Sequence, residues 1–237
     1  MIAMAEPGAK KIDAETAQII EALEGRASFY DFIASLYYLP LSADQIENLA
    51  HTDFSPYKEI NDNLSEGFED IERALHRRNT GTRQELAVDF TSAFAGTASW
   101  KGKYAVPYES VFTSDEGLLF QDAYHEVCQL YRENHVHREE GYDFPDDHLS
   151  FMCEFLALLS KRAIDALEAE DREGALEQMV LSRDFLQSHI LSWFDAFSTR
   201  ALLLLKTRFY KGVLKISKGF FLYDAQSLDE LVEELSK

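Results

Sequence analysis

One short segment of the sequence concentrates the side chains that most often bind metal ions or transfer protons. Residues 135–148 contain three histidines and several carboxylates. Imidazole and carboxylate groups at this density could bind a divalent cation, which would activate water for hydrolysis. The cluster consists of His135, His137, Glu139, Glu140, Asp146, Asp147 and His148. Most of these residues fall in a polar connector, so the pattern also fits a solvated acidic loop.

The sequence contains none of the common catalytic motifs. It has no His-Glu-x-x-His zinc motif, no glycine-rich phosphate-binding loop and no Gly-x-Ser-x-Gly nucleophile elbow. The pairs Glu47–His51 and Glu72–His76 have one residue too many for the Glu-x-x-His motif of a di-iron bundle. We therefore expect no enzyme, no cofactor and no metal site. A small helical metal-dependent hydrolase at residues 135–148 is an alternative.

The end of this segment has the pattern of a helix start. Pro145 suits the first turn, and Asp146 and Asp147 complement the positive N-terminal end of the helix dipole. A neutral imidazole is favoured for His148 at such a position. The Asp147–His148 pair has two interpretations. It satisfies the amide groups of its own first turn, or it is a polar contact point for a ligand.

The charge of the chain limits its class of partner. The 237 residues include 42 acidic and 23 basic side chains, which gives a formal net charge of -19. This balance disfavours nucleic acid, because phosphate groups need a dense basic surface, and it attracts basic peptides. Six bases lie within residues 200–218, which contain no acid. That segment is either a solvated face or a partner-docking face.

Targeting signals and cysteines indicate a cytoplasmic protein that is not integral to a membrane. Residues 1–11 lack the charged and apolar regions of a signal peptide. The most apolar run, Ala201–Leu205, is far shorter than the roughly 20 residues of a membrane-spanning helix. Cys128 and Cys153 fall at positions typical of buried helix faces, so we expect two reduced core thiols.

Apolar residues recur at spacings of three and four along most of the chain, which is typical of helices. One such stripe, Ala27, Tyr30, Ile33 and Tyr37, predicts a first long helix that Pro40 ends. We expect an all-α fold: a single-domain helical bundle of about nine to eleven helices over residues 1–237.

Caps and breakers predict the helix boundaries. Ser42 and Gln45 predict a capping box at the start of a short second helix. Residues 96–117 interrupt the helical pattern and are a candidate seam between two lobes, with an extended piece at Tyr108–Phe112. The C-terminal part is predicted to form one helix ending at Phe197, one over 198–212, a short one through Ile216 and Phe220, and one capped by Ser227.

Several aromatic residues could form the walls of a groove. Phe90 and Phe94 have the spacing of one helix face, which fits either a core or a groove, whereas Tyr108 and Phe112 lie in the extended piece. An aromatic groove beside carboxylates would suit a peptide with an apolar run after paired arginines. Burial of the apolar run contributes about 25 cal/mol per Å², and the carboxylates orient the guanidinium groups.

Eight segments together resemble the TorD/DmsD/NarJ family of molybdoenzyme maturation chaperones, also called redox enzyme maturation proteins. Each segment alone is weak evidence, and their shared order and spacing carry the resemblance. The segments are Arg26–Pro40, Asp89–Gly96, Pro107–Phe112, the Asp115-Glu-Gly-Leu-Leu run, the Tyr131-Arg132 helix end, Pro145–His148 with Glu154–Leu156, Phe185–Trp193 and Phe209–Tyr210.

The resemblance implies an all-helical chaperone that binds the twin-arginine leader or the apo form of a molybdenum enzyme until the molybdopterin cofactor is inserted. It implies a monomer or a homodimer, including dimers that exchange helices. Some members carry tryptophan where this chain has Phe90 and Tyr108, so the groove can differ in shape. The family's leader-binding surface maps onto Phe90, Phe94, Gly96, Tyr108, Glu109, Ser110, Val111, Phe112, Asp147 and His148.

Two other classes of function remain open at this point. One is the metal-dependent hydrolase described above, which tightly held stoichiometric metal would favour. The other is a general protein-interaction scaffold, which would bind partners whether or not they carry a leader.

Overall fold

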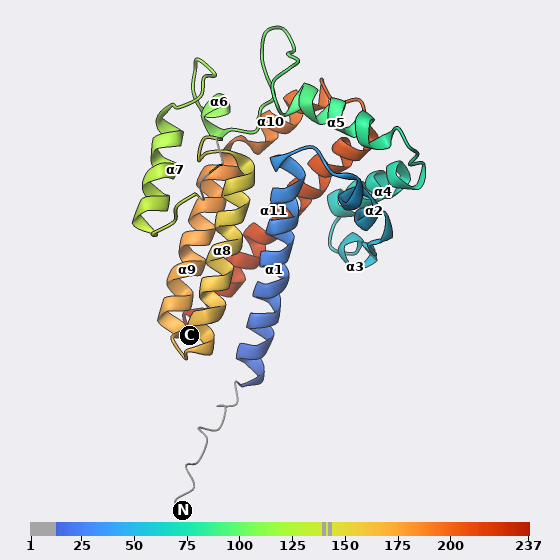
Figure 1. Ribbon diagram of the computed structural model, residues 1–237. Helices are drawn as coiled ribbons and strands as arrows, with labels where there is room; N and C mark the ends of the chain where they lie inside the picture. The colour runs from blue at the N-terminus through green and yellow to red at the C-terminus, as the bar shows by residue number, and fades with distance from the viewer. Residues whose placement is uncertain (1–12, 139–140, 142–143) are drawn as a thin grey trace, which may run out of the picture.

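The computed structural model describes residues 13–138, 141 and 144–237, and within them the protein is all-α (Figure 1). No strand occurs in these ranges, where two isolated β-bridges are the only β pairing. The expected helical bundle is therefore confirmed. The elements are α1 (Ala14–Tyr38), α2 (Ala43–His51), α3 (Ser55–Lys58), α4 (Asp62–His76), α5 (Thr82–Ala93), α6 (Glu109–Thr113), α7 (Asp122–Glu133), α8 (Leu149–Glu168), α9 (Arg172–Phe185), the π-helical segment η1 (Leu186–Leu191), α10 (Ser192–Leu202) and α11 (Arg208–Leu235).

The long helices form the centre of the molecule. α1 packs along α8, and α8 packs along α9, while α11 crosses behind them and packs along α4 (Figure 1). In that view α2–α5 lie on one side of the long helices and α7 lies on the other. None of the helices in the described ranges is both long and apolar enough to cross a lipid bilayer.

The predicted apolar stripe of the first helix lies in the core. Tyr30, Ile33 and Tyr37 are fully buried, in one contiguous apolar cluster that includes residues of α1, α4, α5 and α8–α11. Cys128 and Cys153 are buried and unpaired, as expected for reduced core thiols.

The end of the first helix and the start of the second lie close to where the sequence predicts, whereas α1 begins at Ala14, well before the predicted stripe. The amide of Gln45 donates to the Ser42 hydroxyl at 3.2 Å, and the amide of Ser42 donates to Gln45 Oε1 at 2.9 Å, so the capping box is present. The first helix ends at Tyr38, two residues before Pro40.

The C-terminal boundaries differ from the prediction. The chain stays helical from α9 through η1 to Leu202, and α11 is continuous where three pieces were expected. Ser227 does not cap a helix, because its hydroxyl donates to the Tyr223 carbonyl inside α11. The start of α11 is instead fixed by Asp89 of α5, whose carboxylate accepts from the amides of Lys206 and Thr207, both at 2.8 Å.

Glycines in α4 and α11 allow these helices to cross closely. A Cβ atom at Gly212 would lie 2.6 Å from the Gly67 carbonyl oxygen, and one at Gly67 would lie 2.9 Å from the Gly212 carbonyl oxygen. Gly219 likewise lies against the start of α4. These glycines serve a tertiary contact and do not end the helix, which is why the predicted break near residue 212 is wrong.

The segment 108–112 also differs from the prediction. Only Tyr108 has extended backbone, and Glu109–Thr113 forms the short helix α6. Figure 1 places the irregular residues 96–107 at one end of the molecule, next to α5 and α6. The division into two lobes at residues 96–117 stays a prediction.

Candidate functional site

Five of the ten predicted binding residues meet where α6 faces the start of α8. Tyr108 and His148 form an antiparallel β-bridge, and the amide of Glu109 donates to the Asp147 carbonyl at 3.2 Å. We call Tyr108, Glu109, Ser110, Asp147 and His148 the corner. Residues 108–110 lie 37 or more positions before Asp147 and His148, and the corner joins the irregular segment to the long helices.

Asp147 stabilises the first turn of α6. Its Oδ2 atom accepts from the Ser110 amide at 2.9 Å, which satisfies one of the free amides at a helix N-terminus. The side chain is fully buried. Burial raises the pKa of Asp147, while hydrogen bonds from Ser110 oppose the shift. In the described part of the chain, Oδ1 has no hydrogen-bond partner.

His148 is the N-cap of α8. Its Nδ1 atom accepts from the Ser150 amide at 3.1 Å, so the proton of the neutral ring lies on Nε2. Burial lowers the pKa of His148 to about 3, which keeps the imidazole neutral. The ring contacts Tyr108 edge-on at 4.9 Å and stacks on Phe144 at 5.1 Å. The imidazole satisfies its own helix, and because only 3% of the residue is exposed, its part in ligand binding stays a prediction.

A buried side-chain contact behind the corner includes a residue that the sequence did not predict. His189 Nδ1 lies 3.0 Å from Glu109 Oε2, and both side chains are buried. Burial raises the pKa of Glu109, and the contact with His189 opposes the shift. His189 lies in the π-helical segment η1, and its carbonyl accepts from Trp193 Nε1. The late helix Phe185–Trp193 was part of the resemblance, but helical periodicity does not predict a π-turn.

The predicted rings do not form an open groove. Phe90 and Phe94 are core residues. The ring centroid of Phe94 lies 5.2 Å from that of Tyr37 and 5.6 Å from that of Tyr210. Phe112 is half-buried and stacks on Trp193 at 5.6 Å.

The other two predicted residues support this packing. Val111 is buried within α6, and Gly96 has a φ of 72°, which ends the turn after α5. Because none of the ten residues is fully exposed, their direct contact with a peptide stays a prediction.

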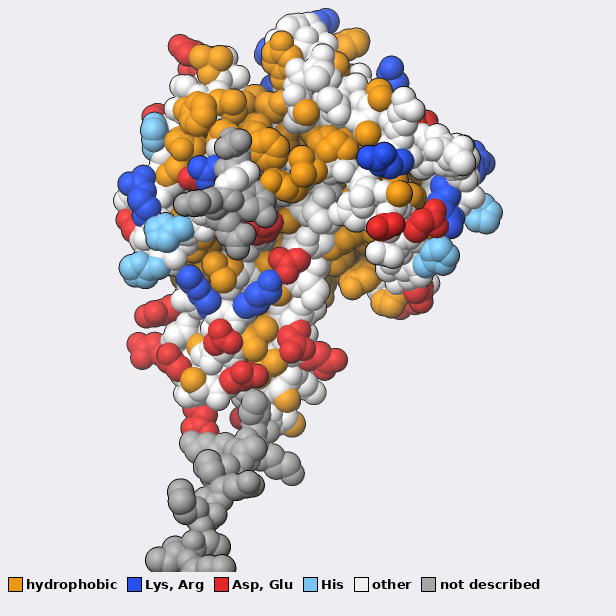
Figure 2. Space-filling view, in the orientation of Figure 1, with side chains coloured by type: hydrophobic (Ala, Val, Ile, Leu, Met, Phe, Trp, Pro, Cys, Tyr) orange, Lys and Arg blue, Asp and Glu red, His pale blue; other side chains and the backbone are white. Residues whose placement is uncertain are grey.

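Exposed apolar side chains lie instead on the two loops that flank α6. They are between 36% and 56% exposed. One loop contains a tight hairpin at Lys101-Gly102, where both φ angles are positive, and the other ends at Phe120, whose φ is 61°. Figure 2 shows apolar side chains gathered on the broad end of the molecule. We define the apolar loop surface as Trp100, Tyr104, Leu118, Leu119 and Phe120.

The 135–148 cluster does not form a metal site in the described residues, where no three suitable ligands converge. Asp146 pairs with Arg138 at 2.5 Å and accepts from Cys128 Sγ at 3.0 Å. Asp147 and His148 serve the corner, and Glu139 and Glu140 lie outside the described residues. The hydrolase alternative therefore has no supporting geometry at its described members.

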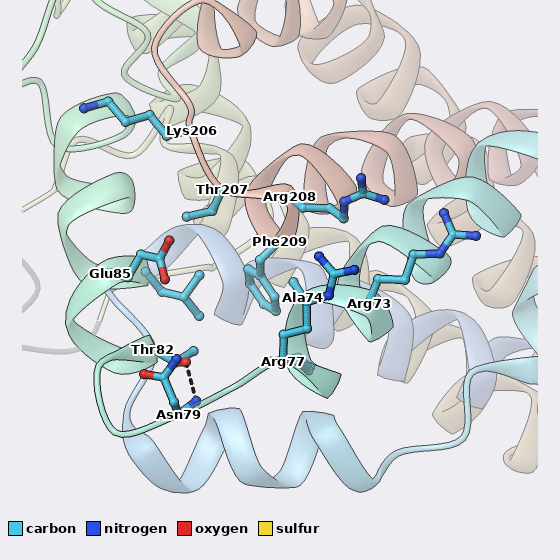
Figure 3. Close-up of a pocket in the computed structure, with 12 residues that line it drawn as sticks. Arg73, Ala74, Arg77, Asn79, Thr82, Glu85, Lys206, Thr207, Arg208 and Phe209 are labelled. Atoms are coloured by element: carbon cyan, nitrogen blue, oxygen red, sulfur yellow. Dashed lines mark hydrogen bonds between the residues drawn. The ribbon is translucent and has the colours of Figure 1, made fainter.

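A basic pocket of about 510 Å³ lies between α4, α5 and the start of α11 (Figure 3). Arg73 and Arg208 line it but are paired with Glu69 and Asp70. Figure 3 shows the Lys206 side chain directed away from the centre of the pocket. None of the residues that line the pocket belongs to the corner.

The described part of the chain is a helical bundle in which the corner links α6 to the start of α8. Comparisons with known proteins identify the family of this fold. The profile of the family described as "Nitrate reductase delta subunit" matches residues 58–199. The chain belongs to this family, which confirms the resemblance found in the sequence.

Two relatives show how far the similarity extends. "Chaperone protein TorD" of Vibrio cholerae is 28% identical over 216 residues, which cover 89% of this chain and 95% of the relative. The protein of the same name from Vibrio vulnificus is 27% identical over 210 residues, with coverage of 86% and 95%. Both are named as chaperones, which agrees with the expectation that this protein is not an enzyme.

One solved structure is similar to part of the chain. It is a protein from Archaeoglobus fulgidus described as a redox enzyme maturation protein. The match has 20% sequence identity and a TM-score of 0.37, and it covers 68% of this chain and 90% of that one.

Proposed function

We propose that the protein is a cytoplasmic chaperone that binds the twin-arginine leader, the apo form, or both, of a molybdopterin-dependent oxidoreductase. In this role it assists cofactor insertion and export of the client. The observation that carries the proposal is the similarity to relatives named "Chaperone protein TorD" along 86–89% of the chain. The proposal needs no catalytic residue, because binding alone protects the client until the cofactor is in place.

The apolar loop surface supplies a contact for the apolar run of a leader. Leu118, Leu119 and Phe120 are consecutive and exposed, so an extended or helical peptide can cover them together. Burial of this surface stabilises a complex by about 25 cal/mol per Å² of apolar area.

Carboxylates next to the apolar residues suit the paired arginines. Asp115 and Glu116 are exposed and directly precede Gly117 and the apolar residues of the same loop. Exposed ion pairs contribute little affinity individually, typically about 0–1 kcal/mol. Their part is therefore to orient the leader and to raise the association rate, in agreement with the net charge of -19.

The corner positions the apolar loop surface in this proposal. Asp147 bonds to the Ser110 amide of α6, and His148 pairs with Tyr108 just before α6. α6 itself lies between the two apolar loops. Tyr108 and Phe112 are half-buried and reach the surface beside them. The family's leader-binding residues thus act largely through the loops that they support.

Replacement of Phe120 by alanine tests the location of the leader site. We expect Phe120→Ala to weaken binding of a twin-arginine leader peptide about tenfold. Truncation of a large side chain that becomes buried in the complex costs about 1.4 kcal/mol or more. Val88→Ala, at an equally exposed residue of α5, is the matched control and should leave the affinity unchanged. Calorimetric titration measures both. Equal affinity of wild type and Phe120→Ala would move the site away from this loop.

A further inference from the structure

An apolar groove lies at the opposite end of α1 from the corner. It has a volume of about 400 Å³ and runs between the N-terminal half of α1 and the C-terminal part of α11. Tyr57, Ile60 and Tyr223 line it and are 36–43% exposed, so much of their apolar surface meets solvent. We call this feature the stem groove.

The stem groove has the length of a short helix. Its lining residues extend over residues 18–29 of α1 and 220–234 of α11. At 1.5 Å per residue, these stretches span about 17 Å and about 21 Å, which is three to four helical turns. α1 and α11 make few contacts with each other compared with the α1–α8 pair, so the two helices form an open pair with room for a third.

Gly25, in the middle of α1, makes no close contact in this chain that would require a glycine. A glycine inside a helix costs about 1 kcal/mol relative to alanine. At the other helical glycines with close neighbours in the described residues, the neighbouring atoms leave little room for a side chain. These are Gly67, Gly212 and Gly219 at the α4–α11 crossing, and Gly174 against the N-cap Asp171. A Cβ atom at Gly25 would meet nothing within 4 Å, yet Gly25 lines the stem groove.

The rim of the stem groove is acidic. Glu230 and Glu234 line it, and Glu24, Asp229 and Glu233 are exposed on the same two helices.

The one base in the described lining is Arg26, which is buried and bound to the Asp224 carboxylate at 2.8 Å. Figure 2 shows acidic side chains on the narrow stem. An occupant with lysine or arginine beside an apolar face complements this charge.

We propose that the stem groove binds a basic amphipathic helix of a partner protein, packed between α1 and α11 with its backbone crossing at Gly25. The close crossing of α4 and α11 over Gly67 and Gly212 is the precedent within this molecule. The groove is separate from the apolar loop surface, with which it shares no residue. The proposal therefore does not depend on the leader site.

The test uses two synthetic 14-residue peptides with the same leucine and alanine face. One carries lysines at both edges of that face, and the other carries glutamates. We expect the lysine peptide to bind the full chain at least tenfold more tightly than the glutamate peptide, with an affinity that falls as salt is raised. Fluorescence anisotropy of labelled peptides at low and high salt measures both effects.

Variants of α1 locate the contact. Gly25→Leu fills the crossing point and should weaken binding of the lysine peptide at least tenfold, whereas Ala17→Leu, at an exposed α1 residue outside the lining, should not. Gly25→Ala should raise the Tm of the isolated chain by about 2–4 °C, as a gain of helix propensity predicts. If the fold required a glycine at position 25, Gly25→Ala would lower the Tm instead.

Two results would overturn the proposal. The first is a failure of discrimination: the protein binds both peptides equally, or wild type and Gly25→Leu bind the lysine peptide equally. The other is concentration-dependent self-association of the wild type that Gly25→Leu abolishes, because the occupant would then be a second copy of this chain. Sedimentation equilibrium of both proteins separates these cases.

Discussion

At the scale of single residues, the corner shows how polar groups in a core stabilise a loop connection. Asp147 and His148 are adjacent, but the two side chains serve different helices. The carboxylate accepts from an amide of α6, and the imidazole accepts from an amide of α8. Burial opposes charge on both, so the pKa of Asp147 is raised and that of His148 is lowered. Neither group is set up as a proton donor and acceptor pair for catalysis.

The lowered pKa of His148 predicts a specific response to acid. In the unfolded chain the ring gains a proton below about pH 6.5, whereas in the folded protein it stays neutral until about pH 3. The neutral ring therefore contributes stability above pH 6.5 that is lost as pH falls through this window. The loss approaches about 1.4 kcal/mol per pH unit.

His148→Asn tests this, since asparagine keeps an N-cap acceptor but does not titrate. We expect the variant to be less stable than wild type at pH 7 and to lose less stability between pH 6.5 and 4.5. Urea unfolding at each pH measures the difference, in which shared contributions such as that of Asp147 cancel. Parallel pH profiles would show that the imidazole is charged in the folded protein.

At the scale of elements, the boundary between the first two helices could be predicted and the boundaries within α11 could not. Ser42 and Pro40 act through neighbouring residues, so their effects are visible in the sequence. Gly212 acts through Gly67, 145 positions away, and Ser227 bonds within its own helix. Tertiary packing overrode the apparent break at Gly212, whereas Ser227 bonds to a carbonyl of its own helix and caps none.

The candidate site was predictable to a similar extent. The resemblance placed residues 108–110 and 147–148 in one candidate set, and the structure shows contacts between them, while their part in binding stays a prediction. It did not show that Phe90 and Phe94 lie inside the core, because the spacing of a helix face is the same for a core and for a groove. The apolar residues 118–120 lie in a loop, where no periodicity indicates exposure.

Replacement by alanine should have opposite effects at Gly212, in the α4–α11 crossing, and at Gly25, in α1. Gly212→Ala would place a methyl group 2.6 Å from the Gly67 carbonyl oxygen, and we expect a loss of about 1–3 kcal/mol in the free energy of unfolding. Gly25→Ala meets open space, and its gain in helix propensity gives the opposite sign. Chemical denaturation of both variants checks the contrast, and a stable Gly212→Ala protein would contradict the close crossing.

At the scale of the whole molecule, charge and apolar surface are unevenly distributed. The net charge is -19. The loops that carry the apolar loop surface lie at the broad end of the molecule (Figure 1), and Figure 2 shows acidic side chains on the stem. A protein with this distribution can hold two basic and apolar segments at separate places. The chain belongs to the family described as "Nitrate reductase delta subunit", and the relative from Vibrio cholerae is named a chaperone.

The most direct measurement of the central claim is a calorimetric titration of the purified protein with the synthetic twin-arginine leader of a molybdoenzyme catalytic subunit. The same leader with both arginines replaced by alanine is titrated in parallel, at low and high salt. We predict one leader bound per chain, with at least tenfold lower affinity for the substituted leader at low salt. Failure of the leader to bind, or equal binding of both leaders at every salt concentration, would contradict the account.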